Sequence, residues 1–112
     1  MLGAMPEAHE PDAHEIDVRD NPDQSRFEAR LDGQIAVSEY KLAGKTIIFT
    51  HTEVPESLEG RGVGSALIRG ALEHARDHAY GVAPICPFVA AYIRRHQEYQ
   101  DLVLPTFRYM VK

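Results

Sequence analysis

The apolar pattern of this sequence changes its period once, at a glycine-rich turn, and the change sets the order of the elements. Before the turn, "KTIIFTHTEV" (residues 45–54) is rich in β-branched residues and predicts a strand. From Arg61, apolar residues recur every four positions, which predicts a helix to about residue 79. The turn itself, "EGRGVGSAL" (residues 59–67), carries three glycines within five residues. A strand, a tight turn and a helix in this order indicate a mixed α/β fold.

Two more strands precede this unit. In "RFEARL" (residues 26–31) apolar residues alternate with charged ones, the period of a half-buried strand. Asp32-Gly33 then forms a two-residue hairpin turn before "QIAVSEYKL" (residues 34–42), and Ala43-Gly44 forms the next turn. The first half of the chain is therefore predicted to be an antiparallel meander, with its third strand ended by Pro55.

A second strand–helix pair follows the long helix. Gly81 is expected to cap that helix, "VAPI" (residues 82–85) to form a short strand, and "CPFVAAYIRRH" (residues 86–96) to form a second helix. The expected buried face of the second helix consists of Phe88, Val89, Tyr92 and Ile93. A strand reached through a crossover helix lies parallel to its neighbour. The expected fold class is thus a small α/β fold, an antiparallel meander plus one parallel strand, packed by two helices.

Length and composition limit the remaining choices. A chain of 112 residues supports one domain, and we expect residues 25–112 to form it. Residues 1–24 are polar, acidic and proline-bearing, which predicts a mostly disordered segment in which "EIDVR" (residues 15–19) is a short edge strand. The net charge of −5 argues against a nucleic-acid partner.

Further features of the sequence bear on the location of the protein and on whether it holds a metal. No apolar run is long enough to span a membrane, and the N-terminus lacks a signal-peptide pattern. Cys86 is the only cysteine, which suits a reducing, cytoplasmic location. His74 and His78 lie four apart on a predicted helix, but no third ligand accompanies them, so no metal site is expected.

The glycine turn has two interpretations from its residues alone. The first turn of a helix has free N–H groups and a partial positive charge, and glycines allow an anion to approach them closely. The spacing matches neither the P-loop nor the dinucleotide-binding fingerprint. A tight loop and an anion site are therefore both open at this point.

Three blocks of the sequence together resemble the small, minimal branch of the GNAT acetyltransferase superfamily. "HTEV" (residues 51–54) and "GRGVGS" (residues 60–65) are similar to its strand and turn, and "CPFVAAYI" (residues 86–93) is similar to its later helix. The blocks occur in the family's order, and the resemblance covers about residues 25–103.

The resemblance implies an acetyl-CoA site. The pyrophosphate of coenzyme A would lie on the backbone N–H groups of the turn, and the pantetheine arm along the edge of "HTEV", where that strand splays from "VAPI". The residues of this expected cofactor site are Val54, Arg61, Gly62, Val63, Gly64 and Ser65. Arg94 and Arg95 are candidates for the 3′-phosphate, although a solvated helix face explains such a pair as well. Glu59 departs from the family, which has Gln or Arg there, so we expect it to point to solvent.

The candidate catalytic residues are His51, Glu53 and Cys86. His51 and Glu53 are two apart on a strand, where we expect them to share a face with Ile47 and Phe49 and either one to act as a base. Cys86 is placed at a helix N-terminus, where it would either accept the acetyl group or protonate the departing thiolate. The alternatives are a hydrogen-bonded rim histidine, a solvated glutamate and a buried structural cysteine. A free backbone N–H near Val54 is the expected oxyanion donor.

These features predict an acetyl-CoA-dependent N-acetyltransferase that acts on an amine, with an open cleft that favours a protein or peptide end. The alternative is a module that binds CoA or acetyl-CoA without significant catalysis. Direct transfer and transfer through Cys86 are both open. No nucleic-acid or membrane partner is expected, and an exposed edge strand is compatible with a monomer or a weak dimer.

Overall fold

The computed structural model describes residues 16–112, which form one sheet and two α-helices. The strands are β1 (Asp17–Asn21), β2 (Arg26–Leu31), β3 (Gln34–Ala43), β4 (Thr46–Glu53) and β5 (Gly81–Pro84). The helices are α1 (Val63–Asp77) and α2 (Pro87–Arg95). The 3-10 helices are Pro22–Gln24, Glu56–Leu58, Gln97–Leu102 and Pro105–Val111.

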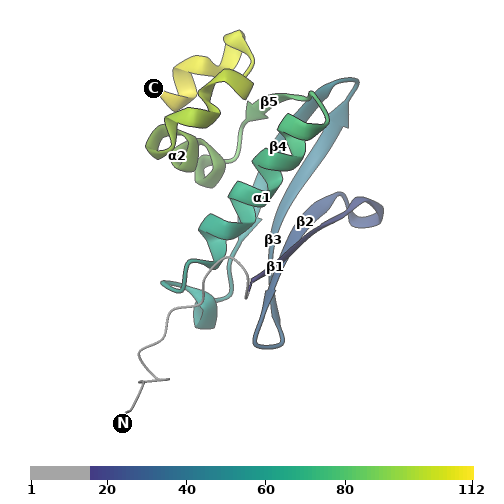
Figure 1. Ribbon diagram of the computed structural model, residues 1–112, viewed down its shortest axis with the longest axis vertical. Helices are drawn as coiled ribbons and strands as arrows, with labels where there is room; N and C mark the ends of the chain where they lie inside the picture. The colour runs from purple at the N-terminus through teal and green to yellow at the C-terminus, as the bar shows by residue number, and fades with distance from the viewer. Residues whose placement is uncertain (1–15) are drawn as a thin grey trace.

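The strands follow one another across the sheet in chain order, from β1 to β5 (Figure 1). The pairs from β1 to β4 are antiparallel. β5 pairs parallel to β4, with Thr46 opposite Gly81 and Phe49 opposite Pro84. α1 forms the crossover between these two strands. The predicted meander, with one parallel strand and two helices, is therefore confirmed.

The sheet begins before residue 25, the expected start of the folded domain. β1 pairs with β2 along its whole length, from Asp17 opposite Arg30 to Asn21 opposite Arg26. The edge strand anticipated at "EIDVR" is thus present, shifted by two residues. Residues 1–15 of the segment expected to be disordered lie outside the described residues.

The core lies between the sheet and α1. This helix packs against β1, β2 and β3, and α2 packs beside it against β4 and β5 (Figure 1). The apolar stripe of α1 is fully buried at Leu67, Ile68, Ala71 and Leu72. It forms one cluster with Phe27 and Phe49 of the sheet. Burying each large aliphatic side chain of such a cluster contributes about 1.5–3 kcal/mol.

A β-bulge interrupts the alternation of β4 at Thr50. Glu39 of β3 lies opposite His51, whereas the next residue, Tyr40, lies opposite Phe49. Thr50 is thus one extra residue on β4. An extra residue reverses the side to which all later side chains of a strand point.

The bulge corrects the expected orientation of the candidate bases. Ile47 and Phe49 are buried in the core, as expected. His51 and Glu53 do not share that face, because they follow the bulge and lie on the opposite side of the sheet. Thr52 takes the core-side position instead, and its hydroxyl is 3.1 Å from that of the buried Ser38.

Two residues of the helical part of the chain differ from the sequence expectation: Gly81 in its role and Phe88 in its burial. Gly81 does not cap α1: the helix ends at Asp77, Ala79 adopts a left-handed φ of 57°, and Gly81 opens β5. Glycine is needed there by packing, because a Cβ would overlap the side chain of Leu104. Phe88 is 41% exposed rather than buried, unlike its expected partners on α2.

Candidate functional site

β4 and β5 separate at the end of their paired region. Their parallel ladder ends at Phe49 and Pro84, and the N–H of Cys86 then donates to the carbonyl of Phe49 at 2.8 Å. Beyond this bond β5 turns into α2, whereas β4 continues to Glu53. Among residues 16–112, the later part of β4 therefore has β3 on one side and no strand partner on the side of β5.

α1 starts beside this open strand edge with uncapped N–H groups. Gly62 is the N-cap residue, and no side chain of the described part of the chain caps the helix. The first helical bond runs from the N–H of Ala66 to the carbonyl of Gly62 at 3.0 Å. The N–H groups of Val63, Gly64 and Ser65 precede that bond. They lie at the positive end of a 15-residue helix, which is the geometry that favours an anion.

The three glycines of the turn are explained by different physical requirements. Gly60 and Gly62 have φ values of +78° and +80°, in the left-handed region that favours glycine. Gly64 has an ordinary φ, but a Cβ at this position would lie 2.7 Å from Cζ of Phe88 and 3.4 Å from Cγ2 of Val54. The turn is therefore both tight and kept free of side chains at the helix start.

A cavity of about 430 Å³ lies against this helix start. Its lining consists of Val54, Leu58, Glu59, Gly60, Gly62, Val63, Gly64, Ser65 and Phe88. The cavity thus joins the end of β4, the turn and the start of α2. It provides room for a ligand beside the N–H donors of the helix start, which favours the anion-site interpretation over a merely tight loop.

The charged residues expected around this cavity are only partly in position. Arg61 adjoins it, but its Nη1 donates to Oδ2 of Asp32 at 2.7 Å. Glu59 is exposed, as anticipated, yet it also lines the cavity. Arg94 and Arg95 lie in the last turn of α2, and Arg94 donates to the carbonyl of Met110 at 2.8 Å. Neither of these two arginines lines the cavity.

Cys86 occupies the N-cap position of α2, as the position of Pro87 predicted. Its side chain is 2% exposed, and its Sγ lies 3.3 Å from Oγ1 of Thr52. Thr52 is in turn bonded to Ser38, so the thiol ends a chain of three hydrogen-bonding groups. No sequence pattern pointed to Thr52 or Ser38, because Thr52 turns toward the helices only through the bulge.

His51 and Glu53 form an exposed pair on the other side of the sheet. Nε2 of His51 lies 2.9 Å from Oε2 of Glu53. The hydrogen bond to this carboxylate raises the pKa of His51 above its ordinary value of 6.5. The pair is thus a proton acceptor held in place at the end of β4.

Replacing Glu53 with glutamine is expected to lower the pKa of His51 toward its ordinary value. A neutral amide does not stabilise the imidazolium as the carboxylate does. The pair stabilises the fold below pH 6.5 and loses this effect as the pH rises through the higher pKa of the folded state. NMR titration of the His51 ring protons measures the shift. The control is Glu56→Gln, which removes a neighbouring exposed carboxylate; an equal change in both variants would contradict the pairing.

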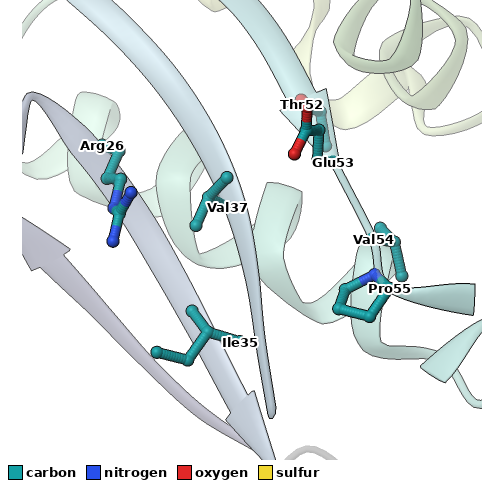
Figure 2. A pocket seen from close by; sticks show the side chains of 7 residues that line it. All are labelled: Arg26, Ile35, Val37, Thr52, Glu53, Val54 and Pro55. Atoms are coloured by element: carbon teal, nitrogen blue, oxygen red, sulfur yellow. The ribbon is translucent and has the colours of Figure 1, made fainter. Parts of the chain in front are cut away.

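A second cavity, of about 590 Å³, lies on the side of Glu53. Figure 2 shows its lining residues, which come from β2, β3 and β4 and from the two residues that follow β4. They are Arg26, Ile35, Val37, Thr52, Glu53, Val54 and Pro55. Val54 lines both cavities, so the two meet at the end of β4. Arg26 was not among the residues selected from the sequence.

The fold and these cavities define a small α/β protein in which a helix without a side-chain cap starts beside an opened sheet. The family model described as GCN5-related N-acetyl-transferase matches residues 26–102. The chain belongs to this family, as the resemblance in the sequence predicted. No helix within residues 16–112 has the length and apolar character needed to cross a membrane.

The chain is also similar to curated relatives called Protein NATD1. It is 30% identical to the Homo sapiens protein over 84 residues, which cover 72% of this chain and 74% of that protein. It is 30% identical to the Bos taurus protein over 102 residues, which cover 85% of this chain and 90% of that protein. The Gallus gallus protein is 30% identical over 84 residues, 72% of this chain and 76% of that protein.

Proposed function

We propose that the protein is an acetyl-CoA-dependent N-acetyltransferase that acts on a primary amine. The observation that carries this proposal is the uncapped start of α1 facing a cavity beside the open edge of β4. Family membership supports acetyl transfer as the reaction. The second cavity, on the other side of β4, supports a separate place for the acceptor.

The residues of the first cavity fit the diphosphate of coenzyme A. The N–H groups of Val63, Gly64 and Ser65 would donate to its oxygens, and the absence of a Cβ at Gly64 allows close approach. Arg61 would add a positive charge, shared with Asp32. Glu59 opposes binding, since it is a carboxylate in the lining, and its exposure allows it to turn away. Arg94 and Arg95 have no part in this proposal, because they lie at the far end of α2.

Acetyl-CoA supplies an acetyl group activated as a thioester. On this chain, the N–H of Val54 would stabilise the developing oxyanion, and the pair of His51 and Glu53 would take the proton of the amine. Cys86, on the helix side of the sheet, would return a proton to the leaving thiolate. Its burial and its bond to Thr52 favour this role over that of an acetyl-carrying nucleophile.

The proposal is tested by adding acetyl-CoA while backbone amide signals are recorded by NMR. Shifts of Val63, Gly64 and Ser65, with smaller effects in α2 beyond Ala90, are expected. A panel of amines then separates an enzyme from a module that only binds CoA, because only an enzyme releases free thiol. Saturating acetyl-CoA that leaves the start of α1 unmoved would remove the basis of the proposal.

Replacing Cys86 with serine is expected to lower turnover by about tenfold or more while acetyl-CoA binding stays within about twofold, since general acid catalysis contributes roughly 10²–10⁴-fold. Serine keeps the hydrogen bond to Thr52 but is a much weaker acid than a thiol. Thiol release and calorimetric titration measure the two quantities. Thr52→Val is the matched variant, because it removes the hydroxyl that bonds to Cys86 and leaves the thiol of Cys86 in place. Full activity of Cys86→Ser would show that the thiol is structural.

A further inference from the structure

The second cavity has opposite charges on its two sides. In Figure 2 the guanidinium of Arg26 and the carboxylate of Glu53 lie on opposite sides of Val37. The surfaces between and beside them are apolar, from Ile35, Val37 and Pro55. A ligand that fits this arrangement carries a negative and a positive group on a small, partly apolar body.

Arg26 is held in place by a buried carboxylate. Its Nε donates to Oε2 of Glu28 at 2.9 Å, and Glu28 is only 4% exposed although no helix covers it. Asn21 and Arg30 also donate to Glu28, each at 2.9 Å, and these bonds together with that of Arg26 lower its pKa. Glu28 therefore stays ionised and anchors the Arg26 side chain.

The outer nitrogens of Arg26 are left for a ligand. Only its Nε takes part in the hydrogen bonds and ion pairs found within residues 16–112. Glu39 lies opposite Arg26 in the ladder but forms no ion pair with it within this range. Two guanidinium N–H groups in one plane match the two oxygens of a carboxylate. The fixed Nε leaves this fork directed away from Glu28.

The spacing of the strands limits the length of the ligand. Arg26 and Glu53 are on β2 and β4, which flank β3. Arg26 is in register with Glu39 and His51, and Glu53 lies two residues further along β4, so the backbones of Arg26 and Glu53 are about 12 Å apart. In an α-amino acid the nitrogen and the carboxylate oxygens lie about 3 Å apart. With one hydrogen bond at each end, such a molecule spans about 9 Å. A cavity of about 590 Å³ also has room for its side chain.

We propose that this cavity binds the acceptor as a free α-amino acid, with the carboxylate on Arg26 and the amino group beside Glu53. The inference rests on the proposed function and narrows it, because it favours a small zwitterion over the protein or peptide end expected from the sequence. The apolar lining favours an aliphatic side chain.

The transfer balances as follows. The ammonium loses a proton to the pair of Glu53 and His51, and the free amine forms a C–N bond to the thioester carbonyl carbon. As the C–S bond breaks, the nitrogen releases its second proton to water, the thiolate takes a proton from the Cys86 thiol, and Cys86 regains a proton from water. The products are an N-acetylamino acid and free CoA. The carboxylate on Arg26 takes no part in bond making and serves only to position the amine.

The test compares L-leucine with L-leucine amide, which differ only at the carboxyl group. With the full chain and saturating acetyl-CoA, kcat/KM from thiol release is expected to be at least tenfold higher for leucine. Arg26→Gln is expected to remove this preference by lowering the value for leucine only. Arg30→Gln is the matched control, because Arg30 also donates to Glu28, from Nη2 to Oε1, but does not line the cavity. It should retain the preference.

A binding measurement keeps the inference testable if no turnover is found. Methyl signals of Ile35 and Val37 are recorded while leucine or its amide is added to the protein without acetyl-CoA. Shifts with leucine alone, lost in Arg26→Gln and kept in Arg30→Gln, would support the inference even if acetyl transfer fails. Equal responses to both ligands, or to neither, would overturn it. Equal turnover of both amines would also overturn it and leave the acetyltransferase proposal intact.

Discussion

A glutamate in place of Ser65 is expected to weaken acetyl-CoA binding by about 10- to 100-fold, the range that loss of a charge-assisted hydrogen bond gives. Ser65 is exposed in the first turn of α1 and lines the cavity at the helix start. A carboxylate there occupies the positive end of the helix and repels a diphosphate. The same carboxylate stabilises the free protein by about 0.3–1 kcal/mol, because it complements the helix dipole. Binding and stability thus change in opposite directions.

Ser65→Gln is the matched control, since glutamine has the size of glutamate without its charge. Calorimetric titration with acetyl-CoA and urea unfolding measure the two effects for both variants. If glutamate and glutamine weaken binding equally, size rather than charge is responsible. If neither weakens it, the diphosphate does not bind at the start of α1.

Replacing Phe49 with alanine is expected to lower the free energy of unfolding by about 3–5 kcal/mol, the usual range for a buried phenylalanine. Phe49 has no exposed surface and belongs to the core cluster beneath α1. Domains of this size have total stabilities of about 5–15 kcal/mol, so the variant should be partly unfolded under mild conditions. Urea unfolding followed by circular dichroism measures the loss.

Phe88→Ala makes the same chemical change at a residue that is 41% exposed. It should cost much less stability than Phe49→Ala, and its main effect should be on acetyl-CoA binding, since Phe88 lines the cavity. Equal destabilisation of the two variants would contradict the burial that separates them.

The order of elements could be predicted from the sequence because each signal is local. The period-two alternation of residues 26–31, the four-residue spacing after Arg61 and Pro87 at the start of the second helix depend only on neighbouring residues. The parallel pairing of β5 follows from chain connection alone. The position of Cys86 at a helix N-terminus was predicted for the same reason.

The arrangement of side chains around the sheet could not be predicted in this way. The bulge at Thr50 depends on how β3 pairs with β4, and no residue type in "TIIFTHTEV" marks it. One extra residue moved His51 and Glu53 to the other face and brought Thr52 to Cys86. Two other contacts could not be predicted either. Leu104 packs against Gly81, although the two residues are far apart in the sequence. Glu28 anchors Arg26, although both look like ordinary strand positions in the sequence.

The bulge also bears on the order in which reactants assemble. Because it places Thr52 on the helix side and Glu53 on the opposite side, the proposed function would assign the nucleotide-bearing reactant to the helix side and the amine to the opposite side. Only the end of β4, at Val54, borders both. Under the proposed function neither reactant would obstruct the path of the other, and we expect a ternary complex with no obligatory sequence of assembly.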